Sequence, residues 1–241
     1  MNTTKSEQKS PWSVLLHSML IAAAALLLVA GNTAVAQEAE NSADADKAEE
    51  PEAGEGHNQE ELNVVFNAIR QSLPVPGEII HMPFADNLDS YGLGTWVVDD
   101  ETVAGDKAFR AQNANARKNV WDAATVKYLA GRISPRDKVV MLLIARAEEL
   151  PANADNGKLL ASIQESEEPW PTLFKKEIEI GPEWGLHAIA ASAKRAFPVG
   201  KTQVVFQYGD TAQTIDFGPL FILNLGPEPK LKDVKKALNI N

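Results

Sequence analysis

The sequence contains no cysteine and few aromatic residues, with only 7% of its 241 residues being Phe, Trp or Tyr. The missing cysteine excludes a disulfide framework, a thiolate zinc site and a cysteine nucleophile. A G-x-S-x-G elbow, an H-E-x-x-H zinc motif and a glycine-rich phosphate loop are also absent. Outside residues 1–61 only His81 and His187 remain, which are too few for a histidine metal cluster. These absences predict a protein that is not an enzyme and needs no cofactor.

Paired carboxylates are the remaining catalytic pattern, because a glycosidase uses two acidic side chains. The neighbouring acids Asp99 and Asp100, and likewise Glu167 and Glu168, are candidates. Adjacent residues of a strand point to opposite faces, however, so such pairs do not converge on one substrate. Residues 62–226 are also too few for a (β/α)8 barrel, which needs about 250 residues. We therefore expect no catalysis.

The expected folded part also lacks an excess of positive charge. The formal net charge is −10, and residues 37–61 hold ten acidic residues against one lysine. Residues 62–241 carry 22 acidic and 20 basic residues, so they are nearly neutral. Because nucleic-acid binding needs a concentrated basic face, we expect no nucleic-acid partner.

An apolar run near the N-terminus is typical of a secretory signal. Residues 14–30 are interrupted only by His17 and Ser18, and the small-residue pattern Ala34-Val35-Ala36 follows. We predict a signal peptide over residues 1–36, cut after Ala36, and hence a secreted or periplasmic protein with no membrane contact. The alternative is an uncleaved anchor helix, since about 17 apolar residues nearly span a bilayer. Residues 37–61 predict a disordered acidic linker.

The rest of the chain predicts a β-sandwich domain over residues 62–226. Short apolar or alternating runs are separated by clusters of Gly, Pro, Asn and Asp, at about ten-residue spacing. Residues 138–147 have no polar face before Arg146, which predicts a central strand buried on both sides and a structural partner for that arginine. Residues 60–72 also fit a helix, and residues 227–241 form a basic tail that is either a short helix or a frayed end. The predicted strands are residues 62–68, 95–99, 107–113, 120–128, 138–147, 158–166, 173–180, 184–191, 202–208, 214–217 and 220–223.

Strand parity indicates one polar sheet face. In residues 202–208, Gln203 and Gln207 share a face and the alternate residues are apolar. In residues 158–166, Gln164 likewise alternates with apolar residues. In residues 119–128, parity assigns Trp121 to the polar set and Tyr128 to the apolar set.

An indole among amides and hydroxyls suits a sugar, because sugar rings stack on aromatic faces and amides bond to their hydroxyls. The alternative is that a loop or the linker covers Trp121. Trp170, in a loop between two prolines, fits either the rim of a site or simple packing. Tyr91 and Trp96 lie beside glycines, which favours packing at a sheet edge.

Three ordered motifs carry a resemblance to a known family. They are residues 119–122 followed by 137–147, residues 168–174 followed by 183–184, and residues 206–218 ending in 220–224. In this order the chain resembles the jelly-roll carbohydrate-binding modules attached to family 10 xylanases and related glycan-active enzymes. The resemblance implies a galactose-binding-like β-sandwich that docks a glycan on one sheet face. It also implies a binding role for Arg117, which precedes Trp121 by four residues as in xylan-binding relatives.

We therefore predict a secreted, non-catalytic module that binds a plant- or envelope-type polysaccharide or oligosaccharide on one sheet face. The predicted binding residues are Arg117, Trp121, Gln164, Trp170 and Gln207. The alternative from another class is a structural or interaction protein of the envelope, which uses the same sandwich to bind a protein partner. Modules of this type often hold a structural calcium ion, for which Glu78, Asp99 or Asp216 are the candidate ligands.

Overall fold

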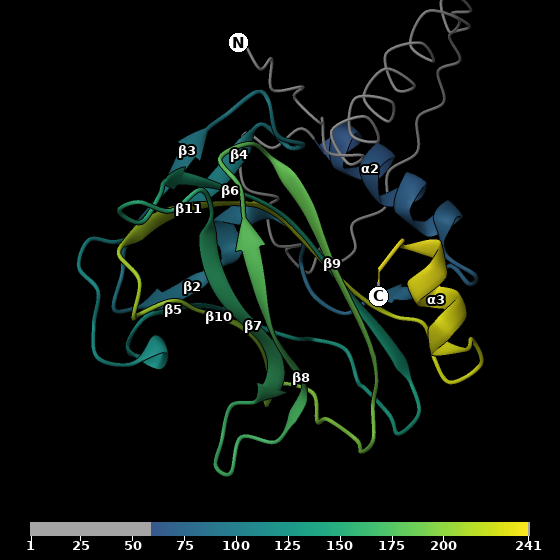
Figure 1. Ribbon diagram of the computed structural model, residues 1–241. Helices are drawn as coiled ribbons and strands as arrows, with labels where there is room; N and C mark the ends of the chain where they lie inside the picture. The colour runs from purple at the N-terminus through teal and green to yellow at the C-terminus, as the bar shows by residue number, and fades with distance from the viewer. Residues whose placement is uncertain (1–58, 241) are drawn as a thin grey trace, which may run out of the picture. The chain divides into compact units, whose positions relative to one another are not determined.

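The computed structural model describes residues 59–240. The predicted signal peptide and nearly all of the predicted acidic linker lie outside these residues. The described part is a β-sandwich of two antiparallel sheets with two flanking α-helices, α2 (Gln59–Ser72) and α3 (Leu231–Ala237) (Figure 1). Within it, no helix is long and apolar enough to cross a membrane.

The first sheet has six strands in the order β3-β4-β11-β6-β9, with β1 paired to β11. Its central strands are the longest and the most apolar. The predicted doubly buried strand, residues 138–147, lies within β6 and is confirmed, because Val139 to Ala145 are buried. The six strands are β1 (Glu78–Ile79), β3 (Gly94–Asp99), β4 (Lys107–Asn113), β6 (Lys138–Glu149), β9 (Gly185–Ser192) and β11 (Gln213–Asn224).

The second sheet has five strands in the order β2-β5-β10-β7-β8. Its inner residues pack on those of the six-stranded sheet to form the main core, in which the rings of Phe206 and Tyr208 pack at a tilt against Phe217. Alternation along each strand then leaves the other side chains on the outer face. The five strands are β2 (Asp89–Tyr91), β5 (Ala124–Tyr128), β7 (Gly157–Glu165), β8 (Thr172–Ile180) and β10 (Thr202–Gln207).

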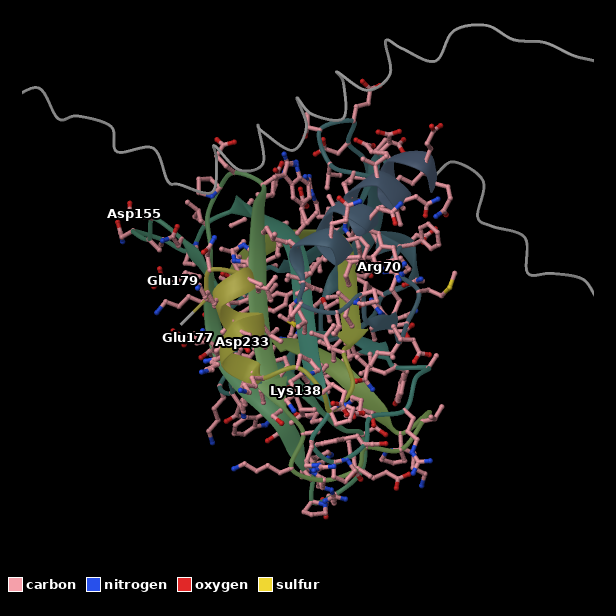
Figure 2. The ribbon with its side chains drawn as sticks, turned by 90° about the vertical axis from the view of Figure 1, so that its right-hand side faces the viewer. Arg70, Lys138, Asp155, Glu177, Glu179 and Asp233 are labelled. Carbon is pink, nitrogen blue, oxygen red and sulfur yellow. The ribbon has the colours of Figure 1, made fainter. Side chains whose placement is uncertain are left out.

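The two α-helices cover part of the outer face of the six-stranded sheet, as Figure 2 shows from the side. Ile69 and Leu73, in and just after α2, and Val234 of α3 are buried against Leu142 and Phe221. This second apolar layer explains why β6 has no polar face. The predicted strand at residues 62–68 is wrong, because these residues are the middle of α2. The basic tail likewise forms a packed helix and is not frayed.

Two other strand predictions differ from the structure. Residues 120–122 form a short 3-10 turn, η2 (Val120–Asp122), and β5 begins only at Ala124. The Asn119 and Asp122 side chains close this turn reciprocally, which ends any extended conformation there. The two strands predicted at 214–217 and 220–223 are one strand, β11, with a register shift between Phe217 and Leu220.

Candidate functional site

The outer face of the five-stranded sheet places polar and aromatic side chains in three rows. The strand register aligns Tyr128, Gln203 and Gln164 in the first row, across β5, β10 and β7. The third row holds Tyr91, Ala124, Gln207, Leu160 and Glu177. Between them, the middle row holds Asp89, Val126, Val205, Ser162 and Lys175. We call the surface formed by these three rows the amide face.

The middle of the amide face is shielded by its neighbours. Val205 and Ser162 point away from the sandwich core, yet each is only 1% exposed. Tyr91 and Tyr128, by contrast, are half-exposed at the β2 and β5 side of the sheet. The small, buried side chains of Val205 and Ser162 therefore lie between longer polar and aromatic side chains that project further. Such a surface suits a flat ligand.

The amides of this face have hydrogen-bonding capacity to spare. Gln164 Oε1 accepts a bond from Ser162 Oγ at 3.1 Å, which leaves its NH2 group free of protein partners in the described part. Gln203, directly opposite Gln164, makes no side-chain hydrogen bond within residues 59–240. Burial raises the pKa of Tyr91, although a hydrogen bond with Gln207 opposes the shift. An amide offers two donors and one acceptor, so the face can bond several hydroxyl groups.

The structure places Gln164 and Gln207 on the same face of one sheet, as parity predicts. Gln207 pairs with Leu160 and Gln203 pairs with Gln164, so all three glutamines project from the amide face. Gln207 is only 9% exposed, so a ligand that spans β7 and β10 would contact mainly Gln203 and Gln164. Their role in binding stays a prediction.

Trp121 does not lie on a strand, so the parity argument that placed it is wrong. It is held in η2, where the carbonyl of Val120 accepts from Gly209 N at 2.8 Å, just beyond the end of β10. The indole is 57% exposed. Trp121 is therefore an exposed side chain beside the Gln207 end of the amide face, not part of its rows.

The faces predicted for β5 are also reversed. Ala124, Val126 and Tyr128, the apolar set, lie on the amide face. Thr125 of the polar set is buried on the core side, 3.4 Å from the Tyr208 hydroxyl. Lys127 reaches past the sheet edge to donate to the carbonyl of Asn87 at 2.6 Å. Partners on other segments of the chain, Tyr208 just after β10 and Asn87 just before β2, satisfy these polar groups, and the sequence of β5 alone does not reveal them.

Arg117 lies in the loop before η2 and uses its guanidinium on the protein backbone. It donates to the carbonyl of Gly92 and, at 3.1 Å, to that of Asp122. These bonds tie the β2–β3 turn to η2, so Arg117 positions loops and does not project from the amide face as predicted. It also lines a pocket of about 410 Å³ with Gly92, Leu93, Gly94, Gln112, Asn113, Ala114 and Asn115.

Trp170 lies in the loop between β7 and β8, and it is half-exposed. Its φ of 49° is in the left-handed region, which costs a bulky residue free energy. The loop adjoins Thr202 through the Ser166–Lys201 backbone bond of 2.8 Å. Trp170 and Trp121 therefore stand beyond opposite ends of β10, about 20 Å apart along the strand. The five predicted residues thus form two face residues and three loop residues, not one cluster.

Tyr91, Tyr128 and Gln203 are the face residues that the predicted site omits. Tyr91 sits on β2, a three-residue strand whose sequence shows no strand pattern. Tyr128 belongs to the apolar set of β5, which parity assigned to the core. Strand parity does predict Gln203 on this face, because Gln203 and Gln207 are four residues apart on the same strand.

The outer face of the six-stranded sheet carries a different polar cluster. Asp216 is fully buried there, and it accepts from Arg110 Nε at 2.6 Å and from Arg146 Nε at 3.0 Å. Arg146 also pairs with Asp100 at 3.1 Å and stacks over the ring of Trp184. The predicted structural partner of Arg146 is thereby confirmed.

This cluster takes up one of the three candidate calcium ligands among the described residues. The Asp216 carboxylate is occupied by two arginines, and Glu78 and Asp99 lie on the separate strands β1 and β3. Within residues 59–240, no group of three or more His, Asp or Glu side chains is placed to hold a metal ion.

Of the two remaining histidines, His81 is buried, and His187 on β9 is partly buried opposite the core residue Leu143. Burial lowers the pKa of His81 to about 4, and a hydrogen bond to the Leu220 carbonyl opposes this shift. Burial lowers the pKa of His187 to about 4 as well. Neither histidine faces the amide face, so they bear on stability and not on binding.

No family model matches the chain, and no curated protein matches it. The solved structures that match include carbohydrate-binding modules, the class that the sequence motifs resemble. The second N-terminal cellulose-binding domain of β-1,4-glucanase C from Cellulomonas fimi is 17% identical, with 63% of this chain and 97% of that one covered and a TM-score of 0.49. The CBM22-1 xylan-binding domain from Paenibacillus barcinonensis is 11% identical over 62% and 96% of the two chains, with a TM-score of 0.42.

A third match is the CBM22-1 and GH10 portion of a Clostridium thermocellum endo-1,4-β-D-xylanase. It is 15% identical, covers 61% of this chain and 29% of that one, and has a TM-score of 0.43. At these values the likeness concerns the arrangement of strands. What this chain binds has to be argued from its own side chains.

Proposed function

We propose that the protein is a secreted, non-catalytic carbohydrate-binding module that docks a polysaccharide or oligosaccharide on the amide face. The observation that carries the proposal is the row of Tyr128, Gln203 and Gln164, in which a half-exposed ring stands next to two amides with unused hydrogen-bonding groups. Gln203 makes no side-chain hydrogen bond within residues 59–240, and the Gln164 NH2 group has no protein partner there. A buried or structural amide would be bonded within the protein. Free amides on a shielded face are available to a ligand.

The chemistry of this face matches that of a sugar chain. Each sugar ring presents an apolar C–H face, which packs on an aromatic ring, and a rim of hydroxyls, which bond to amides. One stacking contact contributes about 1 kcal/mol beyond area burial, and each exposed hydrogen bond adds about as much. Such a site binds weakly, in the micromolar to millimolar range. A repeating polymer compensates by offering many equivalent segments.

The proposal extends to the parts of the chain outside the described residues. It includes cleavage after Ala36, an acidic linker that spaces the domain from the N-terminus, and the jelly-roll, galactose-binding-like version of the sandwich. Expression of the full chain with its own leader tests the first of these. Intact-mass analysis of the exported protein is expected to show Gln37 as the first residue, whereas a full-length mass in the membrane fraction supports the anchor.

Binding is tested with the full chain on a panel of soluble polysaccharides and oligosaccharides, followed by titration of the positives. Gln203→Ala is expected to weaken binding about five-fold, because it removes hydrogen bonds from the centre of the first row. Gln71→Ala, an exposed glutamine at the end of α2, is the matched control and is expected to leave affinity unchanged.

Two outcomes contradict the proposal. A panel without any binding at millimolar sugar is one, and equal affinities of Gln203→Ala and the unmodified protein are the other. Co-purification of one protein in stoichiometric amount, without glycan binding, favours the envelope interaction protein instead.

A further inference from the structure

We infer that the ligand of the amide face carries anionic groups, carboxylate or sulfate, which pair with Lys175 on β8. This inference rests on the proposed function and specifies its substrate class. It starts from the middle row of the face. In this row Lys175 of β8 pairs with Ser162 of β7, which in turn pairs with Val205 of β10. A cation therefore stands beside the covered centre of the face, on the same side as the amides.

The acidic residues that follow Lys175 on β8 interact with other residues. On the outer side of β7 and β8, Lys158 pairs with Glu177 at 3.6 Å. Glu179 accepts a hydrogen bond from Asn156 at 3.3 Å. Figure 2 shows Glu177 and Glu179 near one another at the left edge of the view, next to α3. Lys175 is exposed and makes no ion pair or hydrogen bond within residues 59–240.

Two acidic residues near the neighbouring β7–β8 loop also pair with cations other than Lys175. In the β7–β8 connection and the segment before β10, Lys201 pairs with Glu167 at 3.1 Å, and Arg195 pairs with Glu165 at 2.9 Å. Glu165 and Glu167, at the Gln164 end of the face, are thus bound to other cations. An anionic substituent on the ligand finds Lys175 as an available partner next to Gln164.

The middle row ends on an acidic residue at its other end, which gives the ligand a direction. Asp89 of β2 ends the middle row there, and Asp122 lies nearby, since its charge raises the pKa of Tyr91. A carboxylate or sulfate beside Asp89 at that end of the row would be repelled. The geometry therefore orients the charged substituents of the glycan toward β8 and its neutral hydroxyls toward β2 and β5.

Charge-matched polymers on one backbone test the inference. The full chain is titrated with neutral hydroxyethyl cellulose, carboxymethyl cellulose and cellulose sulfate, and separately with polygalacturonate and its methyl ester. We expect the charged member of at least one set to bind three- to ten-fold more tightly than its neutral match at low salt. Comparison of the carboxylated polymers with cellulose sulfate shows which anionic group the protein binds. The preference is expected to shrink at 0.5 M NaCl, because exposed ion pairs are screened.

Lys175→Gln is expected to remove this preference and to leave the affinity for the neutral polymer unchanged. Lys176→Gln is the matched control, because Lys176 pairs with Ala161 and so falls on the other side of the same strand. Thermal unfolding of both variants checks that the fold is intact.

The failure of this inference differs from the failure of the proposed function. Equal binding of charged and neutral polymers, or a preference that survives Lys175→Gln, overturns the inference and leaves carbohydrate binding standing. Absence of binding to every polymer in the tests and the panel overturns both.

Discussion

The outer faces of the two sheets differ in how their polar groups are satisfied. On the six-stranded sheet, Asp216 is fully buried and held by Arg110 and Arg146, and two helices cover the adjoining apolar surface. On the five-stranded sheet, Gln203 has no side-chain partner in the described part and the tyrosines are half-exposed. A closed network stabilises the fold, whereas open hydrogen-bonding groups are available to a ligand. Polar residues on a sheet therefore indicate function only when their bonds remain unmade.

The largest effect is expected at Asp216. Asp216→Ala leaves two guanidinium groups without their buried partner, so the free energy of unfolding should fall by about 4 kcal/mol. Urea unfolding measures the loss. Asp99→Ala is the control, since its side chain is 91% exposed and 3.9 Å from Lys107, and it should change stability by less than about 0.5 kcal/mol. Equal losses for the two variants would show that the network is no more than a surface feature.

The buried histidines make stability depend on pH. Burial lowers the pKa of His81 and His187 to about 4, so in the unfolded chain each binds a proton more readily than in the fold. Stability is therefore expected to fall as pH drops from about 6.5 toward 4, by about 3 kcal/mol for each histidine.

Unfolding in urea across this pH range measures the slope. His187→Gln should reduce the slope by roughly half, with no change in glycan affinity at neutral pH. A slope unchanged by His187→Gln would mean that this histidine titrates normally in the folded protein.

Two exposed tryptophans, one in η2 beside the amide face and one on the six-stranded sheet, sharpen the comparison. Trp121, near the end of the amide face, should contribute about 1 kcal/mol to sugar binding by stacking, so Trp121→Ala weakens affinity about five-fold. Trp96, 44% exposed on β3 of the other sheet, serves as the control. Trp96→Ala should stay within two-fold of the unmodified protein in the same titration. The reverse ranking would place the glycan on the six-stranded sheet.

The smallest effect is expected at Trp170, beyond the other end of β10. Only long chains reach from the Gln207 end to this loop, given the separation of about 20 Å. Trp170→Ala should weaken binding of a hexasaccharide about two-fold and leave binding of a disaccharide unchanged. Isothermal titration with both lengths makes the comparison, and a loss that is equal for the two lengths would exclude a role at the rim.

Much of the fold and half of the binding face could be predicted from the sequence. The alternation of glutamines with apolar residues in β7 and β10 correctly placed Gln164, Gln203 and Gln207, because both strands are extended over their whole length. Prediction failed around β5, where the bonds that close η2 interrupt the strand and shift Trp121 off the sheet. It also missed Tyr91, since β2 is only three residues long and is defined by its pairing with β5.

The sequence by itself determined the sandwich and the doubly buried strand β6, because strand alternation and apolar runs are local properties of the chain. Only the tertiary structure decided which polar residues are open. Thr125 and Lys127 hydrogen-bond to residues on distant segments. The Arg117 guanidinium donates to the Gly92 and Asp122 carbonyls. Gln203 and Lys175 make no side-chain hydrogen bond within residues 59–240. Whether a polar group is satisfied depends on contacts between residues far apart in sequence, which no local pattern records.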